Sequence, residues 1–146
     1  MTAPSKIFYF VVRRLHWLAR VPLFPQLFDS LLLAWVWLAR RSRFQAIEAL
    51  ETEMLRLPEV KLGVHRFGGM EFVLAGRELG HLHGHGLLDV RMNRPQARAL
   101  IATGRVRPHH VFPNSGWVSF QLESPADVPF AVELLGTRLP LEGTHL

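Results

Sequence analysis

The pattern of hydrophobic and polar positions divides the chain at Pro58. Before Pro58, apolar residues recur at the three- and four-residue spacing of helices, and after it they occur in short alternating runs typical of strands. We expect one helix over residues 5–20 and a second, continuous helix from about Gln26 to residue 57. Pro22 and Pro25 should separate the two helices, because proline interrupts the helical hydrogen-bond ladder.

The part of the chain after Pro58 predicts a sheet with two helices. Asn93 and Ser124 are suited to cap these two helices, which should end near Gly104 and Gly136. The expected strands cover residues 60–67, 70–75, 77–83, 87–92 and 117–122. The order ββββ-α-β-α indicates an α+β fold: a small, mostly antiparallel sheet with two packed helices, behind an apolar and basic helical extension. We therefore divide the chain into an N-terminal extension, 1–58, and a domain, 59–146.

Charge is concentrated in the N-terminal segment. The chain has a net charge of +5, but residues 1–43 hold seven basic residues and one acidic residue, so the remainder is nearly neutral. A nucleic-acid binder more often spreads basic residues over its folded domain, so we expect no nucleic-acid partner. The 146 residues include no cysteine, which excludes disulfides, thiolate metal sites and cysteine nucleophiles. Without a recognisable cleaved signal peptide, we expect a cytoplasmic location.

The N-terminal segment also raises the question of a membrane. Its longest apolar run, Leu31–Ala39, is too short to span a bilayer, which needs about 20 residues. One interpretation of residues 1–43 is that they form helices on the inner face of the membrane, with their arginines against anionic lipid. The other interpretation is that these helices pack on the domain or on a second copy of the chain. Oligomerisation therefore stays open as well.

The most specific chemical signal is a cluster of histidines. His81, His83 and His85 alternate, and the pair His109 and His110 follows. Alternate residues of a strand share one face, so the first three imidazoles should point the same way. Because imidazole titrates near neutral pH, such a group suggests proton transfer or metal ligation. The alternative is that these histidines have no chemical function. They would then be solvated at the end of a strand, with a loop beginning at the glycines that follow His83.

Three chemistries fit this spacing to different degrees. A histidine-triad nucleotide hydrolase would have apolar residues where Gly84 and Gly86 stand. A cupin-like site would bind a metal ion, with His81, His83 and His109 as candidate ligands.

The third chemistry is a metal-free acid–base pocket. There a neutral imidazole deprotonates an enol or phenol, Glu78 or Asp89 orients that imidazole, and Arg77 balances the anion. The ring of Trp117 is a candidate wall of this pocket, although a tryptophan in that position is more often part of a core.

Several short motifs, taken together, resemble a known family. They are His65-Arg-Phe-Gly-Gly-Met-Glu-Phe72, then Arg77-Glu78-Leu79-Gly80-His81-Leu82-His83-Gly84, then Gly104 followed by Pro108-His109-His110, then Ser115-Gly116-Trp117-Val118-Ser119. Their order and spacing, over roughly residues 60–138, resemble a small bacterial domain family grouped with the luciferase of bioluminescent fungi. His85 and His110 have no counterpart in the fungal motifs.

The resemblance implies a luciferase-like oxygenase, a monooxygenase that adds O2 to an enolic or phenolic small molecule such as a 3-hydroxypyrone. It implies no organic cofactor and leaves a metal ion open, and it does not by itself imply light emission. The apolar, membrane-associating N-terminus of the fungal enzyme also favours membrane contact through residues 1–43. In such an enzyme His81, His83 and His109 suit the role of base or metal ligand, and Arg77 and Trp117 suit the anion and the ring of the substrate. Together with the acid–base pocket, this gives His81, His83, His109 and Glu78 as candidate catalytic residues. The candidate substrate-binding residues are Arg77, Trp117, His110 and Asp89. The competing functions are a non-catalytic, membrane-associated binding or assembly module and a histidine-ligated metalloenzyme.

Overall fold

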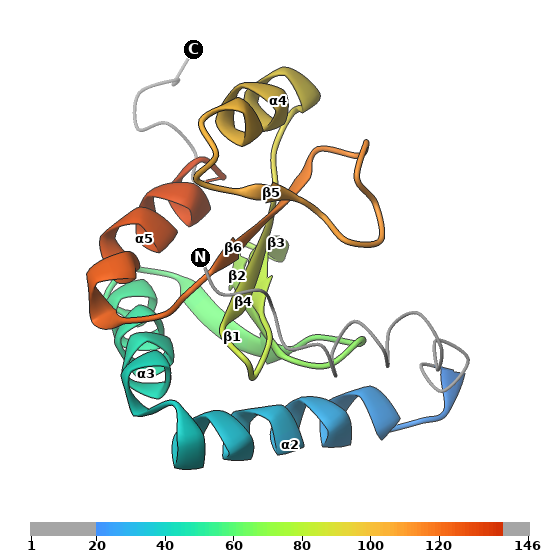
Figure 1. Cartoon of the computed structure of the whole chain (residues 1–146). Helices are drawn as coiled ribbons and strands as arrows, with labels where there is room; N and C mark the ends of the chain where they lie inside the picture. Colours follow the sequence, from blue (N-terminus) through green and yellow to red (C-terminus); the bar gives the residue numbers. More distant parts are fainter. Residues whose placement is uncertain (1–19, 139–146) are drawn as a thin grey trace.

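The structure is a computed structural model that describes residues 20–138 (Figure 1). The helix expected over residues 5–20 therefore lies, apart from its last residue, outside the described residues. The helical elements are α2 (Phe24–Ala39), α3 (Arg41–Leu55), α4 (Arg94–Ala102), the short 3₁₀ helix η2 (Pro125–Asp127) and α5 (Val128–Gly136). The strands are β1 (Val60–Val64), β2 (Met70–Leu74), β3 (Arg77–Leu82), β4 (Leu87–Arg91), β5 (Arg107–Pro108) and β6 (Trp117–Gln121).

The strands form one six-stranded sheet in the order β1-β2-β3-β4-β6-β5, in which every neighbouring pair is antiparallel. The α+β prediction is confirmed. The sequence did not predict β5, because two residues ending in a proline are too short to show any periodicity.

The two faces of the sheet have opposite character. Phe72, Val90 and Val118 lie in register on one face, which carries the core. Helices α3 and α5 pack on this side (Figure 1), where Leu50 and Leu135 are fully buried. The opposite face carries polar side chains, because strand residues alternate between the two faces. The core therefore leaves the middle of the opposite face to polar side chains, while Leu87 at its end packs against Leu32 of α2.

The single helix expected from Gln26 to residue 57 is in fact two helices. The chain breaks at Arg40, whose φ of −138° and ψ of 59° lie outside the helical region. Helix α2 begins at Phe24, with Pro25 in its first turn, where a proline is tolerated. The break turns α3 so that its apolar side packs into the core, as the buried Leu50 shows. No glycine or proline marks the break, so the sequence pattern could not locate it.

Helix α3 belongs to the same core as the sheet. Ile47, Leu50 and Met54 are buried in the cluster that also contains the strand residues. The boundary at residue 58 stays a prediction, but it runs between elements that share this core. Within residues 20–138, no helix has the length and apolar character needed to cross a bilayer.

Candidate active site: a buried histidine–carboxylate cluster

The polar face of the sheet is organised around Asp89, whose side chain is fully buried in β4. The imidazole Nε2 atoms of His81, His83 and His109 lie 3.5, 3.2 and 3.5 Å from Asp89 Oδ2. The hydroxyl of Ser119 donates a hydrogen bond to the other oxygen, Oδ1. Four donors thus surround a single carboxylate, and we refer to these five residues as the Asp89 cluster.

Strand register explains why these side chains meet. Asp89 is paired with His81 on β3 and with Ser119 on β6, so the three side chains project from one face. His83 and His109 lie just beyond β3 and β5. Their backbone N–H groups still donate to the carbonyls of partner-strand residues, at 2.9 and 3.2 Å. The ladder therefore continues far enough to keep both imidazoles on the same face.

A β-bulge brings Glu78 to this face as well. Residues three apart on a regular strand point to opposite sides, but Glu78 and His81 both pair with residues of one face of β2, because Leu79 is an extra residue in β3. As a result, His81 Nδ1 donates a hydrogen bond of 2.6 Å to Glu78 Oε1. His81 is thereby held between two carboxylates.

His83 is also held at both ring nitrogens. Its Nδ1 lies 3.6 Å from Asp29 Oδ1, a carboxylate of α2 that also accepts the backbone N–H of Gly84 at 2.8 Å. A continuous series of acidic and imidazole groups therefore runs from Asp29 to Glu78, in the order Asp29, His83, Asp89, His81 and Glu78.

His109 has a different hydrogen-bond arrangement. Its Nδ1 accepts the backbone N–H groups of Val111 and Phe112, both at 3.1 Å. A ring nitrogen that accepts hydrogen bonds carries no proton, so the proton of the neutral ring is on Nε2 and points to Asp89. The turn after β5 thus fixes the tautomer of His109.

The hydrogen bonds shift the protonation of the cluster. Burial alone would lower the pKa of His81 and His83, but hydrogen bonds to carboxylates outweigh it, raising the pKa of His81 and bringing that of His83 to about 9. Burial would raise the pKa of Asp89, yet hydrogen bonds from His109, His81 and His83 hold that pKa well below its usual value. The carboxylates therefore favour the protonated form of both imidazoles beside the ionised Asp89.

The remaining histidines of this region are held neutral. Burial lowers the pKa of His65 to about 4, that of His85 to about 3 and that of His110 to about 4. Neighbouring cations add to the effect, since a second positive charge nearby disfavours protonation. The hydrogen bond from His81 lowers the pKa of Glu78, which is consequently ionised at neutral pH.

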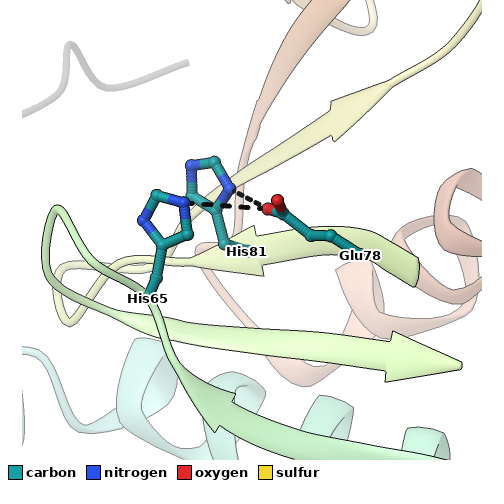
Figure 2. Close-up of side chains that lie close together, drawn as sticks. All are labelled: His65, Glu78 and His81. Carbon is teal, nitrogen blue, oxygen red and sulfur yellow. Dashed lines mark hydrogen bonds and ion pairs between the residues drawn. The ribbon is translucent and has the colours of Figure 1, made fainter. Parts of the chain in front are cut away.

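His65 stacks on His81 beside Glu78, as Figure 2 shows. The ring centroids of the two histidines are 3.9 Å apart, and His65 Nε2 lies 3.9 Å from Glu78 Oε1. Sequence reasoning did not assign a role to His65, Asp29 or Ser119. Asp29, the one acidic residue before position 44, was the only one with a visible signal.

The structure brings most of the other predicted residues near the cluster. The ring of Trp117 lies 5.3 Å from that of His81, and His110 stacks on His109 at 4.4 Å. The ring of His85 is 5.8 Å from that of His83, but it lies in the turn after β3, where Gly86 has a φ of 84°. Arg77 lies exposed at the start of β3, and its side chain makes no hydrogen bond or ion pair within the described part of the chain.

A cavity lies at the Asp29 end of the series. Its volume is about 250 Å³, and it opens between α2, α3 and the turns that contain Gly69 and Gly84. Asp29 and His83 border this cavity, whereas Trp117 does not. The histidines therefore converge as the sequence suggested, but of the three that surround Asp89 only His83 borders this cavity.

Two sets of side chains bring metal-ligand atoms within 4.8 Å of one another: His65, Glu78 and His81, and His81, Asp89 and His109. The hydrogen bonds do not suit a metal ion. A ligating Nε2 of His109 would need the ring proton on Nδ1, which instead accepts two backbone N–H groups. The rings of His65 and His81 are nearly parallel, at 11°, so their lone pairs do not converge on one point.

Fold and cluster together define an α+β domain with a buried histidine–carboxylate site. Residues 76–137 match the family described as Luciferase domain, and the resemblance found in the sequence is confirmed: this part of the chain is a luciferase-like domain. The matched segment contains the whole Asp89 cluster and Glu78, whereas Asp29 and His65 lie before it. No curated protein and no solved structure matches the chain.

Proposed function

We propose that this luciferase-like protein is a metal-free oxygenase that adds O2 to an enolic or phenolic small molecule of the 3-hydroxypyrone type. The observation that carries the proposal is the position of His81, which lies between the buried Asp89 and the partly exposed Glu78, next to the ring of Trp117. An imidazolium held in this way stabilises an anion beside it, and the indole offers a surface for a planar ring.

The protonation of the cluster supports distinct roles for Glu78 and His81 in this reaction. Because His81 and His83 hold protons at neutral pH, the resting base is the ionised Glu78, and His81 is the cation and acid. Glu78 accepts the enol proton, and the enolate carbon forms a bond to O2. His81 then donates a proton to the peroxide anion and regains one from Glu78, so that the substrate and O2 yield a hydroperoxide. His109 and His83 are positioning residues in this scheme.

Asp29, at the other end of the series, would contribute a route for protons to the proposed reaction. Asp29 borders the cavity of about 250 Å³, so protons can exchange with solvent there while substrate covers Glu78. Cavities that enclose drug-sized ligands are generally larger, about 300–1,000 Å³.

Oxygen uptake with a 3-hydroxypyrone tests the proposal, using the full chain after chelator treatment. We expect His81→Gln and Glu78→Gln to lower the uptake rate about 100-fold or more, the usual contribution of an acid or base group. Glu133→Gln, which changes an exposed carboxylate on α5, serves as the matched control and should retain the rate of the natural chain.

Two results would contradict the proposal. One is that neither oxygen uptake nor a shift of the pyrone absorbance to that of its anion occurs with the natural chain. The other is that a metal is present at about one ion per chain and is needed for uptake. That metal result would favour the metalloenzyme alternative, with His81 and its neighbours as ligands.

A further inference from the structure

Helix α2 presents an apolar surface to solvent. Leu23, Leu27, Leu31, Trp35 and Leu38 are 77, 60, 62, 63 and 73% exposed. Their spacing of four, four, four and three residues places them along one side of the helix. We call this stripe the outer face of α2. In Figure 1 the helix runs along the edge of the molecule, away from α4 and α5.

Two polar side chains of α2, Asp29 and Gln26, are engaged within the fold, whereas Ser30 is exposed. The carboxylate of Asp29 accepts the backbone N–H of Gly84, and the amide of Gln26 donates to the carbonyl of Arg66 at 3.2 Å. A helix on the surface of a protein in water normally turns its polar side outward. In α2 the outer face is apolar as well as the buried side that contains Leu32 and Val36, so the outer face is suited to an apolar environment.

The turn between β1 and β2, which is hydrogen-bonded to α2, is also flanked by exposed apolar side chains. Val64 and Phe67 are 74 and 52% exposed, and the guanidinium of Arg66 lies 4.4 Å from the centroid of the Phe67 ring. The hydrogen bond from Gln26 ties this turn to the first turns of α2. Exposed apolar side chains thus also occur on a turn that is tied to the N-terminal part of α2.

The charges around this region favour a lipid surface. Arg20 precedes α2, Arg40 and Arg41 follow it, and all three are exposed. The single acidic residue of α2, Asp29, is engaged within the fold. In an antiparallel pair of two copies, the arginines at opposite ends of α2 would repel one another. Anionic headgroups, in contrast, would neutralise both ends.

We propose that the outer face of α2, together with the turn between β1 and β2, binds the surface of an anionic membrane. The apolar side chains then lie at the boundary of headgroups and acyl chains, and the flanking arginines contact the headgroups. This surface association needs no helix that crosses the bilayer, and it does not depend on the oxygenase proposal.

Co-sedimentation of the full chain with vesicles tests the proposal. We expect binding to phosphatidylcholine vesicles with about 30% phosphatidylglycerol, and weaker binding to phosphatidylcholine alone or at high salt. The triple variant Leu27→Ser/Leu31→Ser/Trp35→Ser should reduce the partition coefficient about tenfold or more, since each change removes apolar area from the interface. Leu55→Ser, at an exposed apolar position on α3, is the matched control and should bind like the natural chain.

A second variant separates charge from apolar contact. Arg40→Gln/Arg41→Gln should weaken binding to the anionic vesicles and reduce its salt dependence, while binding to phosphatidylcholine alone stays the same. The proposal is overturned if the triple variant sediments like the natural chain. It is also overturned if the natural chain ignores vesicles and forms a dimer that the triple variant dissociates, because the occupant would then be a second copy. All substituted side chains are exposed, and circular dichroism checks that each variant is folded.

Discussion

At the scale of single residues, the central feature is a buried charge with an unusual number of donors. Asp89 has no contact with solvent and is surrounded by three imidazoles and a hydroxyl. A buried carboxylate is costly unless it is paired, and here the pairing keeps two imidazoles protonated. The cluster therefore links the stability of the fold to pH.

His83 provides a test of this linkage. Its pKa rises from 6.5 to about 9 on folding, so its contribution to stability is complete below pH 6.5 and is lost as the pH rises to about 9. The full shift corresponds to at most about 3 kcal/mol. Urea unfolding at several pH values should show the difference between the natural chain and His83→Gln shrinking from about pH 6 to about pH 9.5.

His110 gives the matched control for this measurement. Its folded pKa of about 4 lies below the ordinary value of 6.5, so its stability contribution changes only in acid. The difference between the natural chain and His110→Gln should stay constant over the alkaline range. A constant difference for His83→Gln as well would mean that His83 is not protonated in the folded protein.

At the scale of elements, the site depends on how closely α2 approaches the turn between β3 and β4. A side-chain Cβ at Gly84 would lie 2.3 Å from the backbone oxygen of Asp29 and 2.9 Å from the backbone of Leu33. Only glycine permits this approach, which brings the Asp29 carboxylate to His83. Helix α2 is consequently part of the site, although it lies outside the segment that matches the family.

Gly84→Ala should therefore separate α2 from the sheet. We expect it to lower the free energy of unfolding by about 1–3 kcal/mol, the usual cost of overpacking. It should also lower the pKa of His83, which loses Asp29 as a partner. Denaturation and NMR titration of the His83 ring measure the two effects.

Gly136→Ala is the control at this scale. Gly136 lies in α5 with no atom within 4 Å of its added Cβ, so alanine should be neutral or stabilise the protein by up to about 1 kcal/mol. If Gly84→Ala behaves in the same way, α2 does not pack against the turn as closely as described.

At the scale of the whole molecule, the helices before residue 58 and the sheet share one core. Ala46, Ile47, Leu50 and Met54 are each at most 4% exposed and belong to the same cluster as the strand residues. Removal of α3 would expose the apolar face of the sheet and create an aggregation-prone surface. The boundary that we predicted at residue 58 thus separates two hydrophobic patterns, one helical and one strand-like. The elements on its two sides nevertheless share one core.

The fragment 59–146 should consequently fail to fold by itself. We expect no cooperative thermal transition and a largely unfolded circular dichroism spectrum, because three large buried side chains of α3 are missing. The full chain is the reference for both measurements. A cooperative transition of the fragment would instead support the division into an extension and an independent domain.

The amino-acid sequence by itself determined the α+β class, most strands, the capped helices α4 and α5, and the grouping of His81, His83 and His109. These features depend on local periodicity and on short motifs, which can be recognised in the sequence without knowledge of the tertiary structure. The sequence did not locate the break at Arg40, the two-residue strand β5, or the bulge at Leu79 that turns Glu78 toward His81.

Only the tertiary structure decided which groups face one another. Asp89 became the centre of the site because strand register placed it opposite His81 and Ser119, and Asp29 joined it because Gly84 allows α2 to approach. The protonation of the imidazoles follows from these contacts and from burial, since both act through space between residues distant in the chain. For that reason the sequence suggested a histidine as the base. The contacts in the fold instead favour the protonated form of His81 and His83, and Glu78 is the base that we propose.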